Sequence, residues 1–147
     1  MDGLSAAASI IAVIQIAEEV YKKLSDYVFA VKDAREDIER LKNEVLALLD
    51  VLERVADLKK EAEQDLDLAR RSNLNLLNNL EKPVNECQAE LKGLSAKLNT
   101  GQGDTAMKRF GRRALQWPFT RKGVDKKIEA LESYKGTFNL ALTMDNV

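Results

Sequence analysis

The feature that most constrains this sequence is a run of apolar residues that recur at alternating intervals of three and four positions. The run consists of Ile38, Leu41, Val45, Leu48, Leu52 and Val55. This spacing matches one face of an α-helix, whereas the side chains of a β-strand repeat every two residues. We therefore predict an amphipathic helix over residues 33–62, with Leu46 and Leu49 widening its apolar stripe.

Three other segments carry the same kind of periodicity. We predict a first helix over residues 3–31, a third over residues 66–99 and a last one from Thr120 to the final residues. The apolar positions of the third segment keep their phase through Pro83, so a kinked helix is our interpretation, and a break near residues 80–82 is the alternative. In the first helix the predicted buried stripe is Ile10, Ile14, Ala17, Tyr21, Leu24, Val28 and Val31.

Composition favours an all-α fold. The chain has 147 residues, of which only two are proline and seven are glycine, and this length suits one domain with its own core. We predict an antiparallel helical bundle of four long helices, with a hydrophobic N-terminal helix and a short connecting helix that begins at Asp104 or Thr105 and carries Trp117. The expected core residues are Ile14, Tyr21, Leu41, Leu48, Leu52, Val84, Leu91, Leu131 and Phe138.

The first predicted helix opens with "LSAAASIIAVIQIA", residues 4–17, which contain no charge. Asp2 precedes this stretch and Glu18 and Glu19 follow it, which does not fit a secretory signal peptide. As a helix it reaches about 21 Å, against roughly 30 Å of bilayer hydrocarbon, so it does not fit a standing transmembrane helix either. Its small residues allow close helix contacts in a bundle or in lipid.

Residues that carry out catalysis or hold metals are scarce in this sequence. It has no histidine, and its one cysteine, Cys87, falls on a predicted core position, where a buried and inert thiol is expected. The carboxylates lie among lysine and arginine on predicted solvent-exposed faces, and no pair is set apart for acid and base roles. We therefore expect no enzyme activity, no cofactor, no metal and no small-molecule substrate. The net charge of −1 gives no reason to expect nucleic acid.

One segment departs from this charge balance. Residues 104–127 contain eight basic and two acidic residues, a net charge of +6, so the rest of the chain carries −7. This segment could contact anionic lipid headgroups or an acidic partner, and a solvated face is the alternative. The candidate contact residues are Lys108, Arg109, Arg112, Arg113, Arg121 and Lys122.

Three stretches resemble the HeLo-like N-terminal domain of fungal NACHT and ankyrin-repeat proteins of the STAND class. They are "MDGLSAAASIIAVIQIAEEVYK", "DIERLKNEVLALLDVLE" and "RALQWPFTRKGVDKKIEALESYKGTFNLAL". The resemblance covers essentially the whole chain, and Trp117-Pro118-Phe119 and residues 134–138 are its most specific parts. Gly123 departs from the polar residue expected there and leaves the start of the last helix open.

The resemblance implies an N-terminal effector domain of an NLR-like immune receptor, similar in design to the executioner domain of necroptosis. Such a domain would form homo-oligomers, move from the cytoplasm to a membrane on activation, and precede downstream domains in a longer chain. In this hypothesis Glu18 and Glu19 line an aqueous lumen, and the runner-up is an adaptor module that stays in solution. The expected membrane-insertion residues are Leu4, Ala7, Ala8, Ile10, Ile11, Val13, Ile14 and Ile16.

Overall fold

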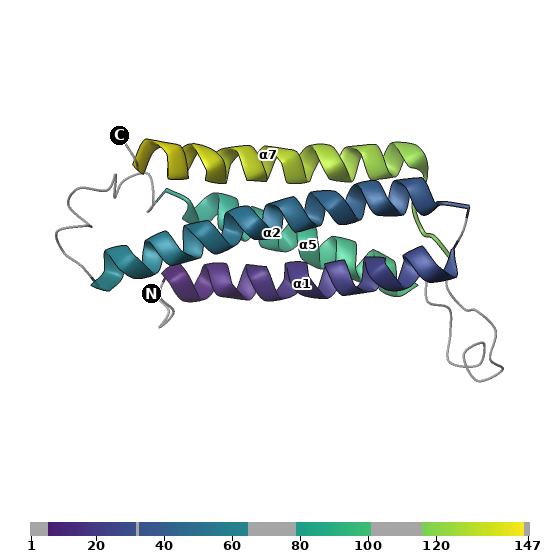
Figure 1. Cartoon of the computed structure of the whole chain (residues 1–147), viewed down its shortest axis with the longest axis horizontal. Helices are drawn as coiled ribbons and strands as arrows, with labels where there is room; N and C mark the ends of the chain where they lie inside the picture. Colours follow the sequence, from purple (N-terminus) through teal and green to yellow (C-terminus); the bar gives the residue numbers. More distant parts are fainter. Residues whose placement is uncertain (1–5, 32, 65–78, 101–115, 146–147) are drawn as a thin grey trace.

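The computed structural model describes residues 6–31, 33–64, 79–100 and 116–145. These residues form four α-helices and no strand, as the all-α prediction requires. The helices are α1 (Ala6–Ala30), α2 (Arg35–Gln64), α5 (Glu81–Thr100) and α7 (Arg121–Asp145), and Figure 1 shows them lying lengthwise beside one another.

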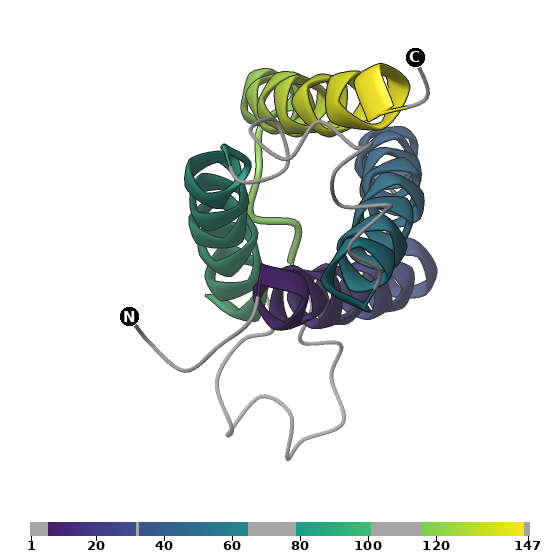
Figure 2. The ribbon, with the colours of Figure 1, turned by 90° about the vertical axis from the view of Figure 1, so that its left-hand side faces the viewer.

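The four helices are arranged as a ring when the bundle is seen along its length (Figure 2). Helix α1 packs along α2 and α5, and α7 packs along the same two helices. Helices α1 and α7 are therefore diagonal to each other, and so are α2 and α5.

Consecutive helices run in opposite directions, but spatial neighbours do not all do so (Figure 1). Lys23 and Tyr27 of α1 contact Ser95 and Leu98 of α5 in the same order, so α1 and α5 run parallel. Helices α2 and α7 are also parallel, since Arg40 pairs with Asp125 and, further along both, Glu44 pairs with Lys135. The prediction of an antiparallel bundle is therefore correct for helices that follow one another in the chain. It is wrong for two neighbouring pairs, α1 with α5 and α2 with α7, which are parallel.

The helix predicted to run through Pro83 does not extend back past Glu81, which agrees with the alternative of a break near residues 80–82. Residues 66–78 of the predicted helix lie outside the described residues. Residues 79–80 form a turn, and α5 begins at Glu81. Pro83 is then the third residue of the helix, where its missing N–H removes no hydrogen bond because the first four amides of a helix have no intrahelical acceptor. The first main-chain bond is made by Val84, whose N–H donates to the Leu80 carbonyl over 2.8 Å.

The predicted short connecting helix falls mostly on residues 101–115, which lie outside the described residues. Its expected last part is not helical, because residues 116–120 have no regular secondary structure. Thr120 does start the last helix as predicted. Its Oγ1 accepts the N–H of Gly123 over 3.0 Å, which caps the first turn of α7 despite the glycine.

The core confirms the register predicted for α2. All six periodic residues from Ile38 to Val55 are fully buried, and Leu49 is also buried, but Leu46 is exposed. Of the nine predicted core residues, seven are buried, whereas Ile14 and Tyr21 are only half-buried and pack against the core.

The buried face of α1 is rotated from the predicted one. The prediction and the structure share Ile10, Ala17 and Leu24, but the positions between them differ by one residue. Both possible stripes of α1 are apolar, so the hydrophobic pattern does not determine which one is buried. The contacts of α1 with α2 and α5 determine it. The fully buried residues of α1 are Ile10, Val13, Ala17, Val20, Leu24 and Tyr27.

Candidate functional site

The predicted membrane-insertion residues are divided between the core and the flanks of α1. Ile10 and Val13 are buried in the core. Leu4 lies outside the described residues, as does the side chain of Ala7. The remaining four are half-buried: Ala8, Ile11, Ile14 and Ile16.

The second half of α1 is held to its neighbours by polar and aromatic contacts. Lys23 Nζ donates to Ser95 Oγ of α5 over 2.7 Å, and the Tyr27 hydroxyl donates to the Leu98 carbonyl. The Tyr27 ring also meets the Trp117 ring edge to face, with 5.4 Å between centroids. On the other side of α1, Lys42 Nζ of α2 lies 5.2 Å from the centre of the Tyr21 ring.

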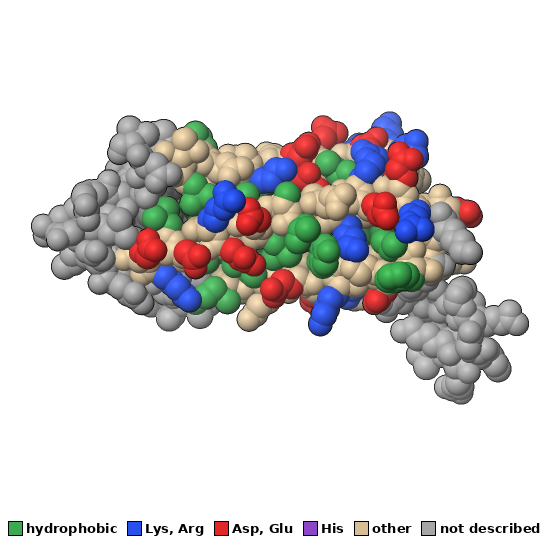
Figure 3. All heavy atoms as spheres, viewed as in Figure 1, with side chains coloured by type: hydrophobic (Ala, Val, Ile, Leu, Met, Phe, Trp, Pro, Cys, Tyr) green, Lys and Arg blue, Asp and Glu red, His purple; other side chains and the backbone are tan. Residues whose placement is uncertain are grey.

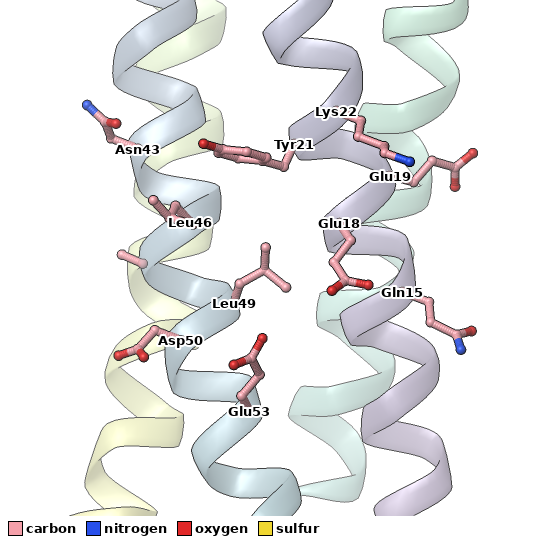
Figure 4. A pocket seen from close by; sticks show the side chains of 11 residues that line it. Gln15, Glu18, Glu19, Tyr21, Lys22, Asn43, Leu46, Leu49, Asp50 and Glu53 are labelled. Atoms are coloured by element: carbon pink, nitrogen blue, oxygen red, sulfur yellow. The ribbon is translucent and has the colours of Figure 1, made fainter.

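Glu18 and Glu19, the predicted lumen carboxylates, line a groove between α1 and α2 with a volume of about 1100 Å³. Figure 4 shows Glu18 of α1 and Glu53 of α2 directed into the space between the two helices, with Leu49 of α2 beside them. Glu19 is directed to the outer side of α1 and pairs with Lys23 over 3.5 Å. The carboxylates of Glu18 and Glu19 therefore point to different sides of α1 and do not face one common space.

The groove has an apolar floor and an acidic rim. Tyr21 points across it from α1, and Leu46 and Leu49 line it from α2 (Figure 4). The charged residues that line it are four carboxylates and one lysine: Glu18, Glu19, Asp50, Glu53 and Lys22. On the face seen in Figure 3, acidic side chains gather over α1 and α2 beside patches of hydrophobic surface.

Sequence reasoning missed this groove. Leu46 was assigned to the buried stripe of α2, yet its side chain is 49% exposed. A detectable signal was that Leu46, Asp50 and Glu53 follow at intervals of four and three, which places a leucine and two carboxylates on one helix face. The contribution of α1 to the groove could not be found this way, because it depends on how the helices pack.

Two residues of the predicted basic contact set are described. Arg121 is 67% exposed, and its Nε lies 3.5 Å from Oδ1 of the mostly buried Asp37, which Arg40 also contacts over 3.2 Å. Lys122 is exposed on the first turn of α7. Lys108, Arg109, Arg112 and Arg113 lie outside the described residues.

The described apolar candidates and the two described basic candidates lie at opposite ends of the bundle. Residues 8–16 lie near the start of α1, whereas Arg121 and Lys122 start α7 at the end where α1 finishes (Figure 1). At about 1.5 Å per residue, the 25 residues of α1 separate these ends by about 37 Å. The structure therefore does not bring Arg121 and Lys122 together with the described apolar candidates of α1.

The Cys87 side chain is enclosed in the core and is not exposed for reaction. It lies fully in the core, and desolvation, with a smaller contribution from Glu90, raises the pKa of its thiol to about 12. A protonated, enclosed thiol is a poor nucleophile. Within the described residues, no cluster of three or more cysteine and carboxylate side chains is placed to hold a metal ion.

A family comparison covers the entire chain. The family described as "Pigment biosynthesis cluster protein PigL N-terminal" matches residues 1–147. The chain belongs to this family. For this PigL N-terminal domain, neither the curated proteins nor the solved structures gave a match. Among its described helices, none is both long enough and apolar enough to cross a membrane.

Proposed function

We propose that this PigL N-terminal domain is the HeLo-like effector domain of a fungal NLR-like immune receptor of the STAND class. In this proposal the domain rests in the cytoplasm, attached to downstream NACHT and repeat domains. On activation it forms homo-oligomers and permeabilises a membrane. The plasma membrane is the proposed target. The resemblance of the three quoted stretches supports this assignment, and the bundle of four long helices is consistent with it.

The observation that carries the proposal is the distribution of apolar side chains around the first half of α1. Ile10 and Val13 face the core, while Ile11, Ile14 and Ile16 are only half-buried on its flanks. A helix that is apolar on its core side and on its flanks can exchange its bundle contacts for lipid without exposing charge to hydrocarbon. In the proposal this half is the membrane-active element.

In the proposal, α1 divides into a first half that leaves the bundle and a second half that stays attached. Tyr21, Lys23 and Tyr27 make the ring and hydrogen-bond contacts to α2 and α5. The first half could then leave the bundle while the second half stays attached. Because residues 4–17 are too short to cross a bilayer unaided, the proposal requires an oligomer that thins the bilayer, with Glu18 and Glu19 facing water.

The test is dye release from anionic liposomes by a chain in which α1 is tethered. Two helical turns before the Lys23–Ser95 contact, on the same faces of the parallel helices, are the half-buried Ile16 and Gln88. Ile16→Cys and Gln88→Cys can be joined by a short, reducible bis-maleimide. The tethered chain should release no dye, and reduction should restore release in the same sample.

Two controls complete this experiment. A chain with Lys23→Cys and Ser95→Cys, tethered in the half that is proposed to stay attached, should release dye in both states. A variant lacking residues 2–17 should be inactive, but it also loses Ile10, Val13 and Ala17 from the core, so the tether decides. Equal release from the Ile16–Gln88 chain before and after reduction, with complete cross-linking, would show that α1 need not move.

A second candidate is an adaptor module without membrane activity. The α1–α2 groove favours it, because exposed Leu46 lies among carboxylates on a surface suited to a protein partner. Absence of dye release at every lipid composition, with the domain still associating in solution, would select the adaptor.

A further inference from the structure

Four carboxylates line the α1–α2 groove, and two of them have a basic partner on their own helix. Asp50 pairs with Arg54 over 2.9 Å, and Glu19 pairs with Lys23. Among the described residues, Glu18 and Glu53 make no ion pair. They are directed into the groove from opposite helices, beside the floor formed by Leu46 and Leu49 (Figure 4).

This arrangement selects a ligand with both cationic and apolar groups. An arginine or lysine can lie between Glu18 and Glu53, and a neighbouring apolar side chain can cover Leu46, which is 49% exposed. Anionic lipid is disfavoured, because four carboxylates and one lysine line the groove. The groove therefore suits a basic segment of a protein.

The chain itself contains a segment with this composition. Residues 107–113, "MKRFGRR", carry four positive charges and two large apolar side chains within seven positions. The described residues flanking this segment are Thr100, at the end of α5, and Gln116, next to Trp117, whose ring contacts Tyr27. Tyr27 also contacts Leu98 of α5, and Lys97 of α5 lies over the ring of Phe119, so this connection is anchored beside α5. The groove lies between α1 and α2, so a second copy is better placed to fill it.

We propose that residues 107–113 of one copy bind in the α1–α2 groove of another, with arginine between Glu18 and Glu53. Since groove and segment are different surfaces, the contact is head-to-tail and can continue from copy to copy. It would supply the oligomerisation step of the proposed function, but it does not depend on membrane activity.

The test is sedimentation velocity over a range of concentrations, with charge reversals on each surface. The groove variant carries Glu18→Lys and Glu53→Lys, and the segment variant carries Arg112→Glu and Arg113→Glu. The control variant carries Glu129→Lys and Glu132→Lys, two exposed positions on α7, diagonal to α1. We expect the wild-type chain to self-associate, each of the first two variants to weaken this about tenfold or more, and the control to leave it unchanged.

Mixing the groove and segment variants separates this proposal from a general charge effect. In each variant alone, the substituted positions meet like charges across the contact. In the mixture, the lysines of the groove variant meet the glutamates of the segment variant, and the unchanged groove of the segment variant meets the unchanged segment of the groove variant, so association should return. Far-UV circular dichroism and the melting temperature of each variant check that the bundle is intact.

Three results would overturn the proposal: a wild-type chain that is monomeric at all concentrations, association indifferent to both reversals, or a mixture that does not recover. A monomeric chain whose groove is occupied by its own residues 107–113 counts as the first of these results and also overturns the proposal. Dye release is measured on separate samples, so that loss of leakage with association intact affects only the proposed function.

Discussion

The hydroxyl of Tyr27 in α1 donates a hydrogen bond to the main-chain carbonyl of Leu98, two residues before the end of the parallel helix α5. This carbonyl is one of the last four in α5, which have no intrahelical donor. A side chain from α1 therefore caps the C-terminus of α5. The contact fixes the axial position of the two helices relative to each other.

Replacing Tyr27 with phenylalanine should lower the free energy of unfolding by about 1–3 kcal/mol, because a buried carbonyl loses its donor. Urea unfolding measures this loss. Tyr134→Phe serves as the control, since the structure gives its half-buried hydroxyl no hydrogen bond. Equal losses in the two variants would mean that the Leu98 contact contributes nothing specific.

Alkaline pH should destabilise the bundle through Tyr27 and Cys87. Burial raises the pKa of the Tyr27 hydroxyl from 10.0 to about 12, and that of the Cys87 thiol from 9.0 to about 12. Both groups therefore hold their protons more tightly when folded, so their stabilising effect is complete below the unfolded pKa values and is lost as pH rises through the folded ones.

We expect the urea midpoint to fall as pH rises from about 9 to about 12, and to fall less steeply for Tyr27→Phe. Midpoints measured at several pH values for both chains check this. A profile of the same slope in the two chains would exclude Tyr27 as a source of the pH dependence.

Leu48 and Leu46 test the register of α2 with the same substitution two residues apart. Leu48 is fully buried and Leu46 is 49% exposed. Leu48→Ala should lower the free energy of unfolding by about 2–5 kcal/mol, because it leaves a cavity in the core. Leu46→Ala should change it by about 0.5 kcal/mol or less. Chemical denaturation compares them, and an unchanged midpoint for Leu48→Ala would contradict the register.

Cys87 should resist thiol reagents in the folded chain. Its side chain is enclosed in the core and its pKa is raised to about 12, so neither access nor thiolate is available at neutral pH. A chromogenic disulfide reagent should react within seconds in denaturant, and far more slowly without it. Rapid reaction of the native chain would place Cys87 outside a stable core.

Much of the fold follows from the sequence because helical periodicity is a local property. The buried residues of α2 from Ile38 to Val55, and those of α5 from Val84 to Leu98, follow from a single apolar stripe with charges on the other side. The inert Cys87 and the cap made by Thr120 follow from their positions in the same pattern.

Packing between distant segments decided the rest. In α1, Val13 and Ile14 are equally suited to burial, and only contact with both α2 and α5 placed Val13 inside. Three further features depend on which helices become neighbours: the parallel pairing of α1 with α5, the groove lined by Tyr21 and Leu46, and the distance between the start of α1 and Arg121. Side-chain period is set by the local backbone, whereas neighbours and their directions are set by how complete helices bury their faces together.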